Sequence, residues 1–574
     1  MPLPVTRLLT AGLAGTLVAA GATVPALAAP AAGYDRTSTV ESRRVDRVKT
    51  PTLDWYKCYD YAECATARLP LDYDQPTGPT TEIAVLRVKA RDQQHKIGSL
   101  FLNPGGPGGS GTSIAQAAPY FLGSALLDRF DIVGVDPRGV AASQNVRCFK
   151  SVKEQTAAYA GLNVSFPYGP AEEKAYVRSS KQVGRACSTT GKPLTGAMST
   201  AEVARDMEVI RRAVGDPKLT YLGFSYGTAL GQYYANMFPD RFRALVVDGV
   251  IDPIAWTGAQ GGGERILDDR MHSADGAYRA LREILKRCDA VGEQYCAFAA
   301  GDPVAEFDAI AERLKAEPLE ITYPDGVFRV TYAEFVGGVL GNLYAAEAGD
   351  YVTQLAAEIK ALLDDRDDPA AQAAVVKRIT EARRAAKAFD FPYENGFETF
   401  SAVVCTDGVF PADANRWRAA TAAADRRAPY FGRAWGWASS PCARDTWTVR
   451  DEDAYRGPFT KRTQAPVLFV GSYWDPATNY DASVSSSRRL PGSGLLSSNN
   501  WGHTAYGTSP CADSAIESYL LTGVLPPAGK TCTDAAQPFA EPLPTDDEVG
   551  TLRADRSRPP VATSVPESIL IGTR

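Results

Sequence analysis

Short apolar runs alternate with helical patterns along the first 253 residues of the chain. Apolar residues recur at helical spacing in residues 199–215 behind a serine or threonine cap, and residues 226–239 predict a second helix that stops at a proline. The intervening runs are too short for helices and are rich in Val, Ile, Leu and Phe, which predicts buried strands. These strands are predicted within residues 82–90, 97–111, 129–139, 219–224 and 243–253.

The pattern becomes helical after Pro253 and returns to strand-and-helix alternation near residue 465. Strand–helix alternation with short buried strands is typical of a mostly parallel sheet flanked by helices, so we predict an α/β fold. We divide it into a first core part at 51–254, a helical cap insertion at 255–400 and a second core part at 401–540. The insertion carries helical patterns at 274–288, 304–317, 351–365 and 373–389, and apolar runs return at 465–478 and 493–507.

The two ends of the chain differ from the body. Arg7 precedes an apolar, Ala-rich run that ends in Ala-Leu-Ala at position 28, which predicts a cleaved signal peptide over residues 1–28 rather than a membrane anchor. Residues 29–50 are polar and charged, and we expect a pro-segment or a flexible lead-in there. Residues 541–574 are Pro-rich and polar, which predicts a surface tail. We therefore expect a secreted protein.

Composition supports a globular catalytic body. Hydrophobic residues make up 45% of the 574 residues, which is enough for a large core. The net charge of −6 is spread along the chain with no basic stripe, so nucleic-acid binding is disfavoured. No later segment is long and apolar enough to span a bilayer, and the oligomeric state is left open.

The chain has ten cysteines, an even number that favours disulfides in an exported protein. Zinc binding is the alternative, but there is no C-x-x-C and only three histidines are present, so no metal is expected. Pairing of sequence neighbours would close local loops, and we predict it for all ten. The pairs are Cys58–Cys64, Cys148–Cys187, Cys288–Cys296, Cys405–Cys442 and Cys511–Cys532.

Ser225 lies in the pattern Gly223-Phe-Ser225-Tyr-Gly227, between a predicted strand and a predicted helix. This is the context of a nucleophile elbow, where the turn is so tight that flanking side chains would clash. A serine hydroxyl needs a base to act as a nucleophile. The pattern alone is weak, so its assignment depends on finding that base and an acid.

The histidine inventory tests the assignment. His95 lies in a charged loop and His272 at the start of the helical insertion, whereas His503 follows the returning strands. An α/β hydrolase has the chain order Ser, acid, His, which selects His503. The acid is predicted to be Asp475, at the end of the apolar run "PVLFVGSYWDP", with Asp481 as a fallback.

An acyl transfer also needs an oxyanion hole. One donor is the backbone N–H of Tyr226, the residue after the nucleophile. The other is expected from the loop "NPGGPGGSG", where prolines lack an N–H, so Gly105 and Gly106 are the candidates and Gly106 is preferred.

The ordered segments "LNPGGPGGSG", "FDIVGVDPRGVAASQNVRC", "YLGFSYGTALGQYYANMFPDR", "VVDGVIDP", "CTDG", "PVLFVGSYWDPATNY" and "GHTAYG" together resemble the secreted tripeptidyl aminopeptidases of actinobacteria. These are prolyl-aminopeptidase-like α/β hydrolases, and the resemblance runs from about residue 50 to about 540. It implies a Ser-Asp-His hydrolase with its triad at Ser225, Asp475 and His503 and without a cofactor. "PGGPG" stands where prolyl aminopeptidases usually have a histidine-led "HGGPG".

The resemblance further implies that the substrates are peptides with a free N-terminus and that short peptides, most often tripeptides, are released from that end. An α-ammonium is best recognised by carboxylates. The family suggests acids near the helical insertion, and the candidates are Asp407, Glu347, Asp350 and Glu264. A secreted esterase or lipase-like hydrolase is the main alternative, because its acyl-enzyme uses the same triad. A non-catalytic binding protein on this scaffold is disfavoured, since all three triad positions are filled.

Overall fold

The computed structural model describes residues 33–323, 326–366, 368–386 and 393–543. The predicted signal peptide, nearly all of the predicted tail and the last residues of the helix predicted at 373–389 lie outside these ranges. Within them, no helix combines the length and the apolar character needed to cross a bilayer.

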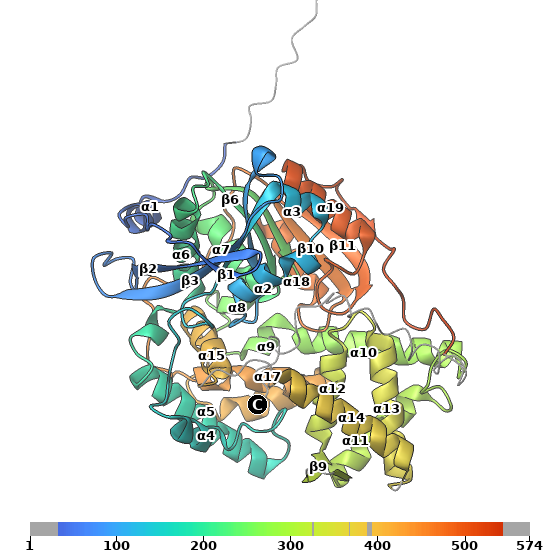
Figure 1. Cartoon of the computed structure of the whole chain (residues 1–574). Helices are drawn as coiled ribbons and strands as arrows, with labels where there is room; N and C mark the ends of the chain where they lie inside the picture. The colour runs from blue at the N-terminus through green and yellow to red at the C-terminus, as the bar shows by residue number, and fades with distance from the viewer. Residues whose placement is uncertain (1–32, 324–325, 367, 387–392, 544–574) are drawn as a thin grey trace, which may run out of the picture. The chain divides into compact units, whose positions relative to one another are not determined.

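A sheet of ten strands organises the described part of the chain (Figure 1). Its order is β1-β2-β3-β5-β4-β6-β7-β10-β11-β12; the pairings from β1 to β5 are antiparallel and all those from β5 to β12 are parallel. The predicted mostly parallel sheet is therefore confirmed. The strands are β1 Tyr56–Tyr59, β2 Ala62–Pro70, β3 Thr80–Val88, β4 Gly98–Asn103, β5 Phe130–Val135, β6 Leu219–Phe224, β7 Phe242–Asp248, β10 Val467–Trp474, β11 Gly494–Trp501 and β12 Thr531–Cys532.

Helices cover both faces of this sheet, which explains why its central strands are apolar throughout. Successive side chains of a strand point to opposite faces, so Leu100 and Leu102 pack with one set of helices and Phe101 with the other. The first face packs on α2 Gly111–Ala117, α3 Ser124–Arg129 and α19 Pro510–Thr522. The second packs on α6 Thr200–Ala213, α7 Tyr226–Met237 and α18 Tyr480–Arg489.

A helical region lies beside the sheet and draws on more of the chain than residues 255–400 (Figure 1). Glu398 accepts hydrogen bonds from Cys148 N and Gln155 Nε2, and Ser180 Oγ lies 2.7 Å from Ser440 Oγ, so segments before and after the predicted insertion are joined. The segments are α4 Val152–Tyr159, α5 Pro170–Thr189, α8 Pro253–Thr257, α9 Leu267–Met271, α10 Ser273–Val291, α11 Pro303–Ala316, the hairpin β8 Leu319–Tyr323 and β9 Gly326–Val330, α12 Tyr332–Asn342, α13 Ala348–Asp364, α14 Pro369–Ala386, α15 Gly396–Asp407, α16 Arg416–Arg427 and α17 Phe431–Gly436.

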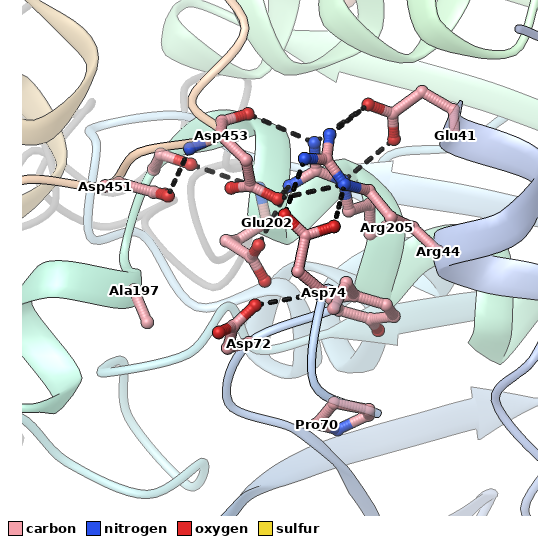
Figure 2. Close-up of polar contacts among 12 residues, drawn as sticks. Glu41, Arg44, Pro70, Asp72, Asp74, Ala197, Glu202, Arg205, Asp451 and Asp453 are labelled. Atoms are coloured by element: carbon pink, nitrogen blue, oxygen red, sulfur yellow. Dashed lines mark hydrogen bonds and ion pairs between the residues drawn. The ribbon is translucent and has the colours of Figure 1, made fainter. Parts of the chain in front are cut away.

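The segment predicted as a pro-segment or flexible lead-in, residues 29–50, contains a helix in the structure. Residues Thr39–Asp46 form helix α1, which Ser38 caps and in which Val45 is fully buried. Glu41 holds this helix on the body, because both of its oxygens accept from the buried guanidinium of Arg205, at 2.8 and 2.9 Å (Figure 2). A single turn or two of helix gives little periodicity, so only this distant partner reveals that the segment is folded.

Arg205 belongs to a buried ionic cluster between α1, α6 and the loop at residues 451–453 (Figure 2). Its guanidinium also contacts Glu202 and Asp453, each at 2.8 Å. The second oxygen of Glu202 lies 2.9 Å from Arg138. Buried charges are tolerated only when they are paired in this way, so the cluster fixes how these three segments meet.

The structure contains the five disulfides that the sequence predicted. They join Cys58–Cys64, Cys148–Cys187, Cys288–Cys296, Cys405–Cys442 and Cys511–Cys532, and no cysteine of the described residues is free.

Candidate active site

Ser225 occupies a sharp turn between β6 and α7. Its backbone has φ 55° and ψ −125°, a strained conformation for a residue with a side chain. A Cβ on Gly223 would lie 2.5 Å from Gly227 O, and one on Gly227 would lie 2.8 Å from Asn103 O. Both flanking positions therefore require glycine, as the elbow pattern predicted.

The glycine loop after β4 lies directly against this turn. A Cβ on Gly105 would lie 2.8 Å from both Ser225 Cβ and Tyr226 N. Gly105 N donates to Asn103 Oδ1 at 3.0 Å, whereas Gly106 N has no acceptor within the described residues. Tyr226 is the first residue of α7, so its N–H has no partner inside the helix either. Of the two loop candidates, Gly106 keeps the free donor.

Asp475 and His503 are in direct contact. His503 Nδ1 lies 2.9 and 3.0 Å from the two carboxylate oxygens of Asp475, which is fully buried. Asp475 also accepts from Ala477 N, Thr478 N, Thr478 Oγ1 and Thr504 N. Burial alone would raise the pKa of Asp475, but the His503 ring and these donors outweigh it and hold the pKa below its usual value. Asp475 therefore stays ionised and fixes the orientation of the imidazole.

The second ring nitrogen of His503, Nε2, forms no hydrogen bond with any described residue. Nε2 is buried without a hydrogen-bond partner, and no hydrogen bond joins it to Ser225 Oγ in the structure. Such contacts often tighten only when substrate binds. Both residues nevertheless rest on the end of β7: Ser225 N donates to Asp248 O at 3.0 Å, and a Cβ on Gly249 would lie 3.2 Å from His503 Cε1.

The helical region contributes a wall beside His503. His503 N donates to Tyr344 O at 2.9 Å, and the two rings meet edge to face with centroids 5.2 Å apart. Tyr344 also packs near Trp435, with ring centroids 6.5 Å apart. Tyr344 could not be predicted from the sequence, because nothing near it in the chain marks it as a neighbour of a histidine 159 residues later.

Asp248 is a second buried carboxylate beside the histidine loop, and it was not among the residues predicted from the sequence. It ends β7, and it accepts hydrogen bonds from Ala505 N and Tyr506 N. The only available signal was its position after the apolar run "ALVV", at the same edge of the sheet as Ser225 and Asp475.

The structure separates the other candidates from this cluster. The side chain of His95 is 69% exposed and contacts Asp92, and that of His272 is 45% exposed and contacts Asp275. Asp481, the fallback acid, is exposed in the first turn of α18.

The four carboxylates proposed for amine recognition have three different environments. Asp407 is fully buried and accepts from Thr200 N, Thr200 Oγ1 and Trp256 Nε1; burial raises its pKa to about 6 although these donors lower it. The side chain of Glu264 is 68% exposed and forms an ion pair with Arg444. Glu347 and Asp350 lie at the start of α13 and are exposed. Partial desolvation by neighbouring segments of the chain, and then the charge of Glu347, raises the pKa of Asp350.

Two groups among the described residues have the ligand spacing of a metal site. One consists of Cys511, Cys532 and Asp534, but its cysteines form a disulfide. The other consists of Glu202, Asp451 and Asp453, where both Glu202 oxygens and one Asp453 oxygen contact arginines. Neither group offers a full set of free anionic ligands.

Comparison with known proteins gives consistent matches over nearly the whole chain. A family model described as "alpha/beta hydrolase fold" matches residues 98–263, and one described as "TAP-like protein" matches residues 428–532. The chain is 30% identical to "Tripeptidyl aminopeptidase" of Streptomyces lividans over 92% of this chain and 97% of that protein. It is 31% identical to "Serine protease Hip1" of Mycobacterium tuberculosis over 82% and 87% of the two chains. It is 30% identical to "Carboxylesterase B" of the same organism over 89% and 95%.

Proposed function

Because the chain belongs to the tripeptidyl aminopeptidase family of α/β hydrolases, we propose that it is a serine peptidase that removes short peptides, chiefly tripeptides, from free N-termini. The observation that supports this function best is the hydrogen-bonded pair of Asp475 and His503. His503 and the strained turn at Ser225 both contact the end of β7.

Ser225 Oγ attacks the scissile carbonyl carbon while His503 Nε2 takes its proton. The carbonyl oxygen becomes an oxyanion, which accepts from the N–H groups of Tyr226 and Gly106. Asp475 holds His503 in the tautomer with Nδ1–H and stabilises the imidazolium that forms. His503 then gives the proton to the leaving amine, and the acyl-enzyme forms. In the second half, His503 takes a proton from water, the water oxygen attacks the acyl carbon, and His503 returns the proton to Ser225 Oγ as it leaves.

Recognition of the substrate amine is assigned to Glu347 and Asp350. The two carboxylates lie three residues apart at the start of α13, and neither forms an ion pair with a described residue. They follow the Tyr344–Ala345 segment, which packs on the histidine loop through Tyr344 O and Gly502. A tripeptide places its ammonium about 10 Å from the scissile carbonyl, so the acids need not touch the triad. Asp407 and Glu264 are less suited, since their oxygens already have partners.

A panel of peptide anilides tests this function. The parent protein should cleave free tripeptide anilides and fail on the N-acetylated forms, and Ser225→Ala should abolish cleavage. In Glu347→Gln and Asp350→Asn, KM for free peptides should rise while turnover of an uncharged ester stays unchanged. Glu312→Gln on α11 is a matched control, because its carboxylate is exposed and paired with Lys315. Equal cleavage of free and acetylated peptides would overturn the exopeptidase assignment.

A carboxylesterase is the second candidate, favoured by the relative of that name. Both activities pass through the same acyl-enzyme, so only the substrate decides between them. Turnover of simple esters without cleavage of any free peptide anilide would support the esterase.

Secretion is part of the proposal. The five disulfides of the described residues support an oxidising compartment. N-terminal sequencing of protein from culture medium should find the chain beginning after residue 28, and the full-length chain retained in cells would contradict it.

A further inference from the structure

Asp248 links the nucleophile and the base through a single residue. Its main-chain oxygen accepts from Ser225 N at 3.0 Å. Its carboxylate accepts from Ala505 N at 3.0 Å on each oxygen and from Tyr506 N at 2.8 Å. These donors come two and three residues after His503, so the carboxylate fixes the loop that carries the base.

The carboxylate of Asp248 is fully buried and forms no ion pair with the described residues. The titratable groups that act on it are His503, from the loop after β11, and Asp475, from the loop after β10. Burial raises the pKa of Asp248 to about 7, although the backbone donors and His503 lower it. A neutral acceptor would satisfy two N–H groups at a lower desolvation cost, so the use of a buried acid needs another explanation.

We propose that Asp248 is a positioning residue for the hydrolysis, which sets the spacing between Ser225 and His503 and whose charge stabilises the His503 imidazolium. This inference rests on the proposed function. When Nε2 takes the proton of Ser225 Oγ, the ring becomes positive. Above about pH 7, where Asp248 is ionised, its carboxylate supplies a second negative charge besides that of Asp475. Asp248 also holds Ser225 through its main-chain oxygen. A change at its side chain should therefore move the histidine loop while the nucleophile stays in place.

The central variant is Asp248→Asn, which keeps the shape and removes the charge. Its amide also turns one acceptor into a donor toward the histidine loop. We expect kcat to fall about 10- to 100-fold with little change in KM, the range that follows from a displacement of about 1 Å. The loss of kcat should grow as the pH rises through about 7, because only the ionised carboxylate of the parent stabilises the imidazolium.

Asp131→Asn is the matched control. Asp131 is also buried and accepts a backbone N–H, from Ala90 at 2.8 Å, but it lies at the start of β5, whereas Asp248 ends β7. Unlike Asp248, it also pairs with Lys96, at 2.8 Å. This variant should leave kcat and the pH profile unchanged even where it lowers the melting temperature. Circular dichroism checks that Asp248→Asn is folded. If it is not, Asp248→Ser removes the charge with a smaller side chain and is tested in the same way.

A second readout needs no activity. The chain has only three histidines, so 13C-histidine NMR in a Ser225→Ala background follows each ring separately. In Asp248→Asn the ring resonances of His503 should shift, while those of His95 and His272 stay as in the parent and serve as internal references. Unchanged His503 ring resonances together with parental kcat would overturn the inference. That result would leave the proposed function intact if Ser225→Ala is inactive, whereas an active Ser225→Ala would refute the proposed function itself.

Discussion

Alanine at Gly105 should disable the enzyme without unfolding it. Gly105 has φ +95°, and an added Cβ would lie 2.5 Å from Phe224 O and 2.8 Å from both Ser225 Cβ and Tyr226 N. All three atoms belong to the elbow, whose backbone is already strained at Ser225. The loop must therefore move away from the turn, and Gly106 moves with it.

The magnitude follows from two separate effects. A side chain at such a positive φ costs about 1–3 kcal/mol of stability. Loss of one oxyanion donor typically lowers kcat by about 10²–10³-fold. Gly169→Ala separates the two, because Gly169 has φ +89° and nothing within 4 Å of the added Cβ. It carries the backbone strain without the contact to the elbow.

The assay is kcat and KM on a tripeptide anilide, together with the rate of labelling by a fluorophosphonate. We expect Gly105→Ala to lose kcat and labelling rate in parallel while KM changes little. Gly169→Ala should keep parental kcat with a comparable loss of thermal stability. A Gly105→Ala enzyme with kcat within about threefold of the parent would refute the proposed oxyanion loop, and so would an equal loss of kcat in Gly169→Ala.

Three further predictions concern the triad and the buried ionic cluster. Asp475→Asn should lower kcat by about 10³–10⁴-fold, since the imidazole loses its orienting carboxylate; parental kcat would show that another acid serves His503. Glu41→Gln should destabilise the protein to urea by about 2–4 kcal/mol, because Arg205 is left buried with fewer partners, and an unchanged midpoint would contradict that role. Burial, and then the neighbouring Asp453, raises the pKa of Asp451 to about 8. The folded state then holds a proton that the unfolded chain releases, so stability should fall as pH rises from about 4 to 8. Asp451→Asn should flatten that slope in urea titrations at several pH values, and a slope equal to the parent's would count against the buried proton.

Much of the fold and the catalytic constellation could be predicted from local patterns. The strand before Ser225 and the helix after it are visible as an apolar run and a helical segment, and the flanking glycines mark the turn. Asp475 and His503 could be selected because each follows a strand and because the chain order of an α/β hydrolase leaves few choices. The cysteine pairs could be predicted for a similar reason, since neighbours in sequence close short loops.

The remaining features depend on partners far away in the chain. Helix α1 is held by Glu41 on Arg205, 164 residues later, so its short sequence looked like a mobile segment. Asp407 seemed free to bind an amine, yet Thr200 and Trp256 occupy its oxygens. Neither relation produces a periodic signal, because each is set by how whole segments pack.

Local patterns in the sequence were enough to predict the mostly parallel sheet, the turn at Ser225, the choice of Asp475 and His503 as candidate acid and base, and the disulfide pairs. These features are encoded over a few residues, through side-chain periodicity, glycine at a strained turn and proximity along the chain. The preference for Gly106 over Gly105 gained its physical reason only in the folded structure, where Gly105 N is bonded to Asn103. The folded structure alone reveals that Asp248 joins Ser225 to Ala505, which lies 257 residues after Asp248. The physical reason is that a buried polar group must find its partner wherever folding brings one, and sequence spacing carries no record of that choice.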